Sequence, residues 1–470
     1  MMGEKLYQQV AALLEQQIEQ GTYVAGDRLP GLRQLRQHFG VSMATMVTAC
    51  EVLEQRGILE ARPRSGFYVC GQSDSAPLPE EPCDELEGPS LVTGQERVLE
   101  LVQSHNDPSI LSLGAAAPPA ECLPVAALDR SFARVRRTRR DDVSAYDFPP
   151  GNLELRTQIA QRMGYAGCTV GPDDIVLTQG CQDALTLSLR AVGSPGDVVA
   201  IESPTFYGIL QAIESLGMRA LEITTDPVEG MSPQALARAL DTWPIRACVM
   251  MPSFGNPLGH LASDERKQTL VNLLAEHEVP LIEDDVYGEL CFKGPRPWAA
   301  KAWDTRGNVL YCSSFSKTLG AGLRVGWVAP GRYRERVTYL KYATSQATAP
   351  MDTLAVADYL ERGGYERYLG RARRYYQRQV RRVTDAVLRH FPRGTQVTRP
   401  QGGFVIWVVL PEGYDSLALQ RQALEAGMSI APGPYFSPSG RYRRCLRLSC
   451  ALPQSVDVET ALSRLYKSPQ

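Results

Sequence analysis

From about residue 101 onward, short apolar runs alternate with stretches of helical periodicity, and this alternation restricts the possible fold more than any other feature. The runs DIVLTQG, DVVAIES, RACVMMPS, PLIEDD and VLYCSSFS are typical of buried strands, and each is followed by a helical or loop segment. Strands that alternate with helices form a mostly parallel sheet that is covered by helices. We therefore predict an α/β body over residues 101–470.

The stretch before this body has the composition of a linker. Residues 71–100 are rich in proline, serine and acids, and residues 72–100 contain eight acidic residues and one basic residue, Arg97. Such a segment buries too little apolar surface to fold alone. Because 470 residues exceed the length of one ordinary domain, we predict a separate domain over residues 1–70, an acidic linker over residues 71–100, and then the body.

Charge and residue counts exclude several classes of protein. The formal net charge of −2 means that any nucleic-acid binding must come from a local patch. The N-terminus lacks an apolar signal core, and the apolar runs are far shorter than the ~20 residues that span a bilayer, so we expect a cytoplasmic protein. The cysteines lack paired metal-ligand spacing and the histidines lie in no catalytic motif, which predicts neither a metal site nor a Ser-His-Asp triad.

The first 70 residues show the order of elements of a winged helix-turn-helix. Apolar residues from Leu6 to Ile18 have helical spacing, and a second helix is expected over residues 32–39. Gly40 makes a turn, and Ser42 is suited to cap a third helix that runs to about Arg56. Two short strands then surround residues 62–66. A small helical protein-interaction module is the alternative interpretation.

The polar residues of this domain fall where such a fold meets DNA. Arginines beside the second helix and on the wing are placed to contact phosphates, and residues at the start of the third helix are placed to reach base edges. The predicted DNA-binding residues are Arg33, Arg36, Ser42, Met43, Thr45, Thr48, Arg62 and Arg64.

The segment DRLPGLRQLRQHFGVSMATMVTACEVLEQRGILEARPRSGFYV resembles the DNA-binding domain of the GntR family along its whole length. It departs from that family at Gly31, where serine is usual, and at Met43, where arginine is frequent. The first departure removes a phosphate-binding cap and the second removes a DNA contact, so the resemblance implies the fold, and we expect affinity or operator preference to depart from the family norm.

The sharpest motif of the body is SSFSKTLG over residues 313–320, which is followed by GLRVG. Lys317 follows a strand-like run, lies among small hydroxyl residues, and precedes Arg324 by seven positions. A lysine forms a Schiff base with an aldehyde cofactor, and hydroxyls together with an arginine hold a phosphate. This pattern predicts a site for pyridoxal 5'-phosphate.

The other groups that this cofactor needs follow the strands in chain order. Asp284 ends an apolar strand and is suited to keep a pyridine nitrogen protonated, although Asp285 adjoins it. Asn256 and Tyr287 are suited to bind the ring's phenolic oxygen, and Tyr207 to stack on the ring. The run TQGCQDAL over residues 178–185 opens a helix directly after a strand, and such a helix N-terminus is suited to bind the phosphate. Arg447 is suited to bind an amino-acid carboxylate.

Together these motifs resemble the fold-type-I aminotransferases over residues 105–465, a fold with a large mostly parallel α/β domain and a small α+β C-terminal domain. The resemblance implies that Lys317 carries the cofactor and that Arg447 clamps a carboxylate. It also implies that Tyr146 reaches the phosphate of a neighbouring subunit, so a homodimer is expected. The implied phosphate-binding residues are Gly180, Cys181, Gln182, Ser314, Ser316 and Arg324; Cys181 departs from the hydroxyl residue that often stands there.

A GntR-like domain joined by a linker to an aminotransferase-like body is the architecture of the MocR regulators. This resemblance implies a transcriptional regulator that binds operator DNA and senses the cofactor, an amino acid or an amine. Two alternatives stay open: an active aminotransferase that carries a DNA-binding domain, and a cofactor-binding protein without regulated DNA binding.

Overall fold

The computed structural model describes residues 5–19, 22–23, 27–62, 65–69 and 88–465, and the chain divides into two compact units. The first unit is built mainly from residues 1–76, and the second from residues 77–380 and 390–470. We refer to the first as the head and to the second as the body.

The head is a winged helix-turn-helix, as predicted. Its elements are α1 (Leu6–Glu19), α2 (Leu32–Phe39), α3 (Met43–Gln55), β1 (Leu59–Arg62) and β2 (Gly66–Val69), and the two strands pair antiparallel. Gly40, with a φ of 67°, ends α2 in the left-handed region. Buried Leu14, Leu35, Met46 and Leu53 join the three helices in one core.

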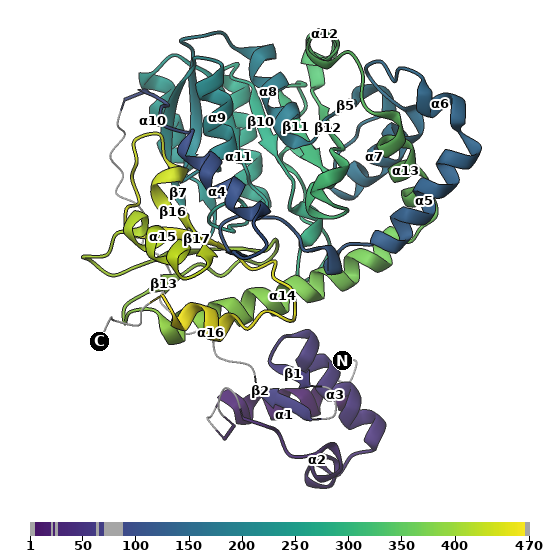
Figure 1. Ribbon diagram of the computed structural model, residues 1–470, viewed down its shortest axis with the longest axis vertical. Helices are drawn as coiled ribbons and strands as arrows, with labels where there is room; N and C mark the ends of the chain where they lie inside the picture. Colours follow the sequence, from purple (N-terminus) through teal and green to yellow (C-terminus); the bar gives the residue numbers. More distant parts are fainter. Residues whose placement is uncertain (1–4, 20–21, 24–26, 63–64, 70–87, 466–470) are drawn as a thin grey trace. The chain divides into compact units, whose positions relative to one another are not determined.

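The body contains a large sheet that lies between helices (Figure 1). Its order is β3-β7-β6-β9-β10-β11-β12-β5, and the pairs from β7 through β11 are parallel. The bounds of these strands are β3 (Ser90–Leu91), β5 (Val176–Thr178), β6 (Val198–Ser203), β7 (Arg219–Asp226), β8 (Gly230–Met231, paired with β7), β9 (Ile245–Met250), β10 (Leu281–Asp284), β11 (Val309–Ser314) and β12 (Gly326–Ala329). The prediction of a mostly parallel α/β sheet is confirmed.

Alternating side chains of the strands pack into two different cores. On β6, Val198 and Ala200 belong to the cluster that contains Leu236 of α10 and Leu270 of α11. Val199 and Ile201, which point to the opposite face, belong to the cluster that contains residues of α8 and α9. Helices on both faces explain why the strands are apolar along their whole length. The helices around this sheet are α7 (Leu153–Tyr165), α8 (Cys181–Val192), α9 (Tyr207–Ser215), α10 (Pro233–Thr242), α11 (Asp264–Glu276) and α12 (Arg334–Ser345).

A smaller antiparallel sheet forms the C-terminal part of the body. It consists of β13 (Gln396–Val397), β14 (Val405–Val409), β17 (Cys445–Ser449) and β16 (Ala431–Pro432), while β15 (Met428–Ser429) pairs with β4 (Leu111–Ser112). The remaining helices are α5 (Val125–Thr138), α6 (Arg140–Ser144), α13 (Pro350–Glu361), α14 (Tyr365–His390), α15 (Ser416–Glu425) and α16 (Val458–Ser463).

The last part of the predicted linker is folded onto the body. β3 pairs antiparallel with β7, and α4 (Arg97–Gln103) buries Val98 and Leu101. The acidic composition of residues 71–100 concealed these few apolar anchors, which are sufficient because a sheet edge and a hydrophobic cluster already exist there. Residues 70–87 lie outside the described part of the chain.

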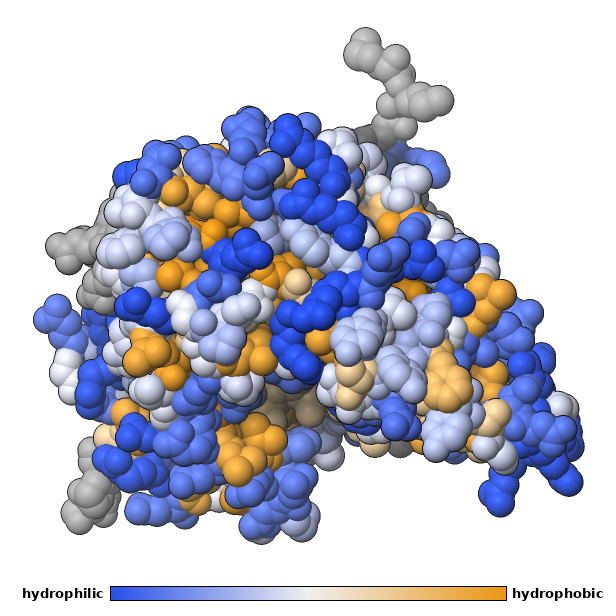
Figure 2. Space-filling model, turned by 90° about the horizontal axis from the view of Figure 1, so that it is seen from above, coloured by the Kyte–Doolittle hydropathy of each residue, from blue (hydrophilic) through white to orange (hydrophobic). Residues whose placement is uncertain are grey.

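The surface of the body carries separate apolar areas among polar ones (Figure 2). In the described ranges, no helix combines the length and the apolarity that crossing a membrane requires.

Candidate functional site

The predicted cofactor residues other than Tyr146 and Arg324 lie at or just beyond the carboxyl ends of strands of the large sheet. Thr178, Ser203, Met250, Asp284 and Ser314 end β5, β6, β9, β10 and β11, and the candidates follow them or, like Asp284, stand at the end itself. Because the strands from β6 through β11 run in the same direction, their carboxyl ends meet at one edge of the sheet, where ligands of α/β proteins bind.

Lys317 lies on a short 3-10 helix, Phe315–Lys317, that follows β11. The hydroxyl of Ser314 caps this helix by accepting a hydrogen bond of 3.4 Å from the backbone N–H of Ser316. The Nζ of Lys317 donates to the carbonyl of Ala116 at 2.7 Å and lies 5.7 Å from the ring centroid of Tyr287. Burial, with the positive charge of Arg447 as a further cause, lowers the pKa of Lys317 to about 8. The amine is therefore a better nucleophile near neutral pH than an exposed lysine.

The three consecutive carboxylates after Ile282 have different surroundings. Glu283 accepts hydrogen bonds from the backbone N–H groups of Ala300 and Lys301. Asp285 accepts from Nη2 of Arg296 at 2.6 Å and from the hydroxyl of Tyr311 at 2.9 Å.

Asp284, in contrast, is 2% exposed and accepts a hydrogen bond of 3.4 Å from the thiol of Cys181. Burial raises the pKa of its carboxyl group to about 7, against an ordinary value of 3.8. A cation beside this carboxylate would lower its pKa and keep it ionised. Asp284 is thus suited to pair with a protonated ring nitrogen, whereas Asp285 is already paired with Arg296.

The N-terminus of α8 lies under the guanidinium group of Arg324. Nη2 of Arg324 donates to the carbonyl of Gln179 at 2.7 Å. A Cβ on Gly180, which has a φ of 89°, would come within 2.5 Å of that Nη2, and a Cβ on Gly326 would come within 2.5 Å of the Gly180 carbonyl carbon. The two glycines therefore allow a cationic side chain and a helix N-terminus to face the same place, an arrangement that favours a phosphate.

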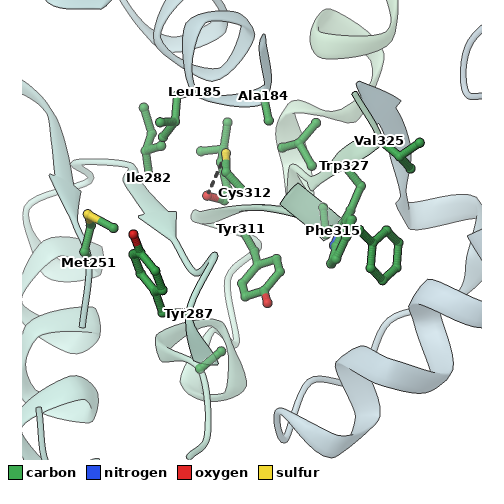
Figure 3. Packing of buried hydrophobic residues seen from close by; sticks show 14 of the residues in the cluster. Ala184, Leu185, Met251, Ile282, Tyr287, Tyr311, Cys312, Phe315, Val325 and Trp327 are labelled. Atoms are coloured by element: carbon green, nitrogen blue, oxygen red, sulfur yellow. Dashed lines mark hydrogen bonds between the residues drawn. The ribbon is translucent and has the colours of Figure 1, made fainter. Parts of the chain in front are cut away.

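The aromatic and amide groups predicted to contact the cofactor ring are buried. Within the described residues, the hydroxyl of Tyr287 and Oδ1 of Asn256 are buried without a hydrogen-bond partner. Figure 3 shows the hydroxyls of Tyr287 and Tyr311 pointing in different directions in the packed interior, with Phe315 against Trp327. Tyr207 is 8% exposed, and its ring lies 4.6 Å from that of Phe206 and 5.5 Å from that of Phe436.

Arg447 on β17 is fully buried and only partly satisfied. Its Nη2 donates to the carbonyl of Gly114 at 2.7 Å, and its guanidinium carbon lies 5.6 Å from the ring centroid of Phe436. Nε and Nη1 have no hydrogen-bond partner among the described residues. Unpaired cationic donors in a buried position suit an anionic group such as a carboxylate.

Two predicted site residues lie apart from these groups or point elsewhere. Tyr146 is 71% exposed and stacks on Phe148 at 5.1 Å. Gln182 is exposed at the start of α8, where its Nε2 donates to the carbonyl of Gly208 at 2.7 Å.

The head presents its predicted residues on α2, on the start of α3 and on the wing. Arg33 and Arg36 are exposed on α2, while Thr45 and Thr48 lie on α3. Met43 is the first residue of α3. Ser42 caps α3 through the backbone N–H of Thr45, and the two hydroxyls lie 2.8 Å apart.

The wing arginine that the structure describes already has partners within the head. The guanidinium of Arg62 lies 4.1 Å from the ring centroid of Tyr68, and its Nη2 lies 3.4 Å from Oε2 of Glu60. Arg64 lies outside the described residues. Gly31, as predicted, gives α2 no side-chain cap.

The groups that hold the cationic side chains in place are not evident in the sequence. The carbonyls of Gly114 and Ala116 accept from Arg447 and Lys317, and Arg296 fixes Asp285. The run GAAAPPA contains only glycine, alanine and proline, so no side chain in it indicates a functional role. Apart from its charge, nothing distinguished Arg296 from a surface residue.

These residues fit pyridoxal phosphate. Among the residues that the structure describes are a buried amine of lowered pKa, a buried carboxylate without an arginine partner, unpaired phenol and amide groups, and a helix N-terminus beside an arginine. Each matches one part of the cofactor: the aldehyde, the ring nitrogen, the phenolic oxygen and the phosphate.

Comparison with known proteins agrees with this fit. Residues 109–465 match the family of aminotransferase class I and II, and residues 6–69 match the bacterial regulatory proteins of the gntR family. The uncharacterised HTH-type transcriptional regulator YjiR of Escherichia coli is 40% identical over 98% of this chain and 97% of its own. The 2-aminoadipate transaminase of Thermus thermophilus is 31% identical over 79% of this chain and 93% of its own.

A solved structure of similar fold contains a pyridoxal-phosphate derivative. LysN, an alpha-aminoadipate aminotransferase from Thermus thermophilus in complex with N-(5'-phosphopyridoxyl)-L-leucine, is 28% identical and superposes with a TM-score of 0.73 over 79% of this chain and 93% of its own.

A winged helix joined to a fold-type-I pyridoxal-phosphate domain defines a class of DNA-binding transcriptional regulators with an aminotransferase-like body. The chain belongs to the aminotransferase class I and II family and, with its gntR-type head, to the MocR regulators of the GntR family.

Proposed function

We propose that this regulator senses an amino acid at Arg447 and Lys317, and that binding of this amino acid in the body changes the affinity of the head for DNA. The observation that carries the proposal is Arg447, a fully buried guanidinium group with two donors unpaired among the described residues. An unpaired buried cationic donor is costly, so a site that retains one favours an anionic ligand.

The remaining site residues have roles that follow from their surroundings. Pyridoxal phosphate, when bound, supplies an electron sink for chemistry on an amine. Lys317 provides the attachment point, and its lowered pKa keeps part of the amine neutral near pH 8. Asp284 holds the ring nitrogen in its protonated form. Asn256 and Tyr287 bind the phenolic oxygen, and Tyr207 packs beside the ring. The phosphate is held by Gly180, Cys181, Gln182, Ser314, Ser316 and Arg324.

The site recognises the amino-acid ligand by its carboxylate and its amine, the two groups that amino acids share. Its carboxylate would bind the unpaired donors of Arg447, and its amine would lie beside Lys317, whose amine would accept or return a proton. An amine without a carboxylate would leave Arg447 unpaired and bind more weakly.

The second candidate function is a complete transamination. It is favoured by the same lysine, because an amine with a pKa near 8 is suited to move protons at neutral pH. The two functions share the binding step and differ in whether an oxo acid is released.

In the head, Arg33, Arg36, Arg62 and Arg64 would contact phosphates, and Ser42, Met43, Thr45 and Thr48 would lie against base edges. Since its DNA partner lies in the cytoplasm of a bacterial cell, we place the protein there.

A homodimer of bodies would explain the exposed aromatic residues beside Tyr146. Phe148, Tyr339 and Tyr342 are 52%, 61% and 51% exposed. They line an open groove of about 730 Å³ together with Pro149, Pro150, Arg334, Glu335 and Thr338. A second copy of this chain would cover this groove and receive Tyr146 near its phosphate site.

Titration of the cofactor-loaded protein with each common amino acid, followed by absorbance, tests the proposal. At least one amino acid should change the spectrum, and Arg447→Gln should weaken that response at least about tenfold while leaving the starting spectrum unchanged. Analysis of the same mixtures for an oxo acid separates sensing from transamination. No spectral change with any amino acid would contradict the proposal.

A further inference from the structure

The carbonyl of Gly114 accepts a hydrogen bond from one of the three donor nitrogens of Arg447, and the other two are unpaired among the described residues. The hydrogen bond from Nη2 to this carbonyl is 2.7 Å long, and Nε and Nη1 have no partner among the described residues. The direction of the guanidinium group therefore depends on the position of Gly114.

Gly114 is held in a short segment, residues 111–114, that we call the strap. Its β4 pairs with β15, the N–H of Leu113 donates to the carbonyl of Ser429 at 2.9 Å, and the N–H of Ser449 donates to the carbonyl of Leu113 at 2.8 Å. The strap is thus bonded to the small sheet that also carries Arg447.

The strap also contacts α4 closely. A Cβ added to Gly114 would come within 2.4 Å of Cδ1 of Leu101, and within 3.1 Å of the carbonyl carbon of Ile430. Leu101 is 1% exposed and lies in a cluster with Trp407, Ala431 and Phe436 of the small domain. A glycine is needed here because no side chain fits between the strap and α4.

The chain just before α4 is attached to the other part of the body. β3 pairs with β7 of the large sheet, and Val92 is buried in the core of that sheet. Between β3 and α4 there are only residues 92–96, so a short segment joins an anchor on the large sheet to an anchor on the small domain. In the sequence, this segment follows the stretch that leads from the head.

We propose that Gly114 is the positioning residue of Arg447, and that its contact with Leu101 transmits occupancy of the carboxylate site to α4. A carboxylate that binds the guanidinium group fixes it, and the strap and α4 then become more ordered. This inference rests on the proposed carboxylate role of Arg447. A ligand changes α4 only by its different affinity for the two arrangements, and the effect is reciprocal.

The test uses the full-length, cofactor-loaded protein and sodium propionate, a simple carboxylate, with sodium chloride at equal ionic strength as the control. Calorimetry measures propionate binding, and hydrogen exchange measures the order of α4 amides over residues 97–103. In the wild type, propionate should slow exchange in α4 about fivefold or more, and chloride should not.

Two variants test the contact between Gly114 and Leu101. Leu101→Ala should bind propionate within about threefold of the wild type, yet lose the propionate-dependent change in α4, because the hydrogen bond to Gly114 remains while the contact is gone. Val98→Ala is the matched control, since Val98 is equally buried on α4 in the same cluster, and it should keep the response.

A third variant tests the positioning role. Gly114→Ala should weaken propionate binding about tenfold without changing the cofactor spectrum, and adding Leu101→Ala should restore part of the affinity by removing the nearer clash.

The outcomes distinguish failure of this inference from failure of the proposed carboxylate site. If propionate binds the wild type while α4 does not respond, or if Leu101→Ala and Val98→Ala behave alike, the inference is overturned and the carboxylate site stands. If Gly114→Ala binds propionate normally, the positioning role is overturned. Absence of propionate binding to the wild type would overturn both the inference and the proposed role of Arg447.

Discussion

The thiol of Cys181 donates a hydrogen bond of 3.4 Å to Oδ1 of Asp284, so the first residue of α8 touches the carboxylate at the end of β10. The sequence placed Cys181 among the phosphate-binding residues. Its side chain instead points at the group proposed to face the ring nitrogen, while its backbone N–H remains at the helix N-terminus. One residue thus contacts the carboxylate through its side chain and leaves its backbone for the phosphate.

Replacing Cys181 with serine and replacing it with alanine should move the pKa of Asp284 in opposite directions. A hydrogen bond to the charged form lowers a carboxyl pKa, and a hydroxyl donates more strongly than a thiol. Cys181→Ser should therefore lower the Asp284 pKa from about 7, and Cys181→Ala should raise it. Infrared titration of the cofactor-free protein, with Asp284→Asn to assign the band, measures both shifts. Equal pKa values in the two variants would show that the hydrogen bond has no effect.

The two neighbouring aspartates should fail in different ways when each is changed to asparagine. Asp284→Asn should keep the cofactor and the fold but weaken the spectral response to amino acids, because the ring nitrogen loses its charge partner. Asp285→Asn should instead destabilise the body by about 3–5 kcal/mol, because Arg296 is left buried and unpaired. Thermal unfolding and amino-acid titration of both variants distinguish the effects. A reversed pattern would mean that Asp285 is the cofactor's partner.

Cofactor attachment should depend on pH through Lys317. The neutral amine is the reactive form, and its pKa of about 8 means that the neutral fraction rises through half at that pH, well below the value for an exposed lysine. The rate at which pyridoxal phosphate joins the cofactor-free protein should follow this fraction. Arg447→Gln should raise the midpoint, because it removes a positive charge that disfavours the protonated amine. An unchanged or lower midpoint in that variant would contradict the electrostatic role of Arg447.

Arg33→Ala and Arg36→Ala should each weaken binding to all DNA sequences and reduce the salt slope by about 1. Both side chains are exposed on α2. Arg56→Ala is the control, because Arg56 pairs with Glu15 at 2.7 Å within the head, and its salt slope should equal that of the wild type. Binding measured over a series of salt concentrations decides this, and slopes that do not separate the α2 variants from the control would refute the phosphate contacts.

Thr45→Ala should change sequence preference rather than the salt slope. Thr45 shares a hydrogen bond with the capping residue Ser42 at the start of α3, where a base-reading side chain is expected. Selection of preferred sequences from a random DNA pool measures the change. An identical selected sequence for the variant and the wild type would exclude Thr45 from readout.

The sequence indicates candidate site residues wherever a polar or ionisable side chain follows a strand. Lys317, Asp284 and Asn256 are predictable as neighbours because each comes at or after the end of an apolar run typical of a buried strand, and parallel strands bring their ends together. The choice of Asp284 over Asp285 was open in the sequence, and it depends on Arg296, which reaches Asp285 from a loop eleven positions on.

Other features were invisible because they depend on the backbone or on distant partners. Gly114 acts through its carbonyl and through lacking a side chain, neither of which a residue pattern reveals. The anchors at β3 and α4 were hidden in a stretch of linker-like composition, where two buried residues, Val98 and Leu101, outweigh the acids around them. These anchors can be predicted only when the sheet edge and the hydrophobic cluster against which they pack are known.

The central claim is that an amino acid bound at Arg447 changes DNA affinity, and the most direct test is the dissociation constant of the cofactor-loaded protein for a DNA fragment selected by the protein itself. It is measured at one salt concentration with and without an amino acid that changes the cofactor spectrum. We predict a change of about fivefold or more in the wild type, and none in Arg447→Gln. An unchanged constant in the wild type, with the amino acid shown by absorbance to be bound, would contradict the account.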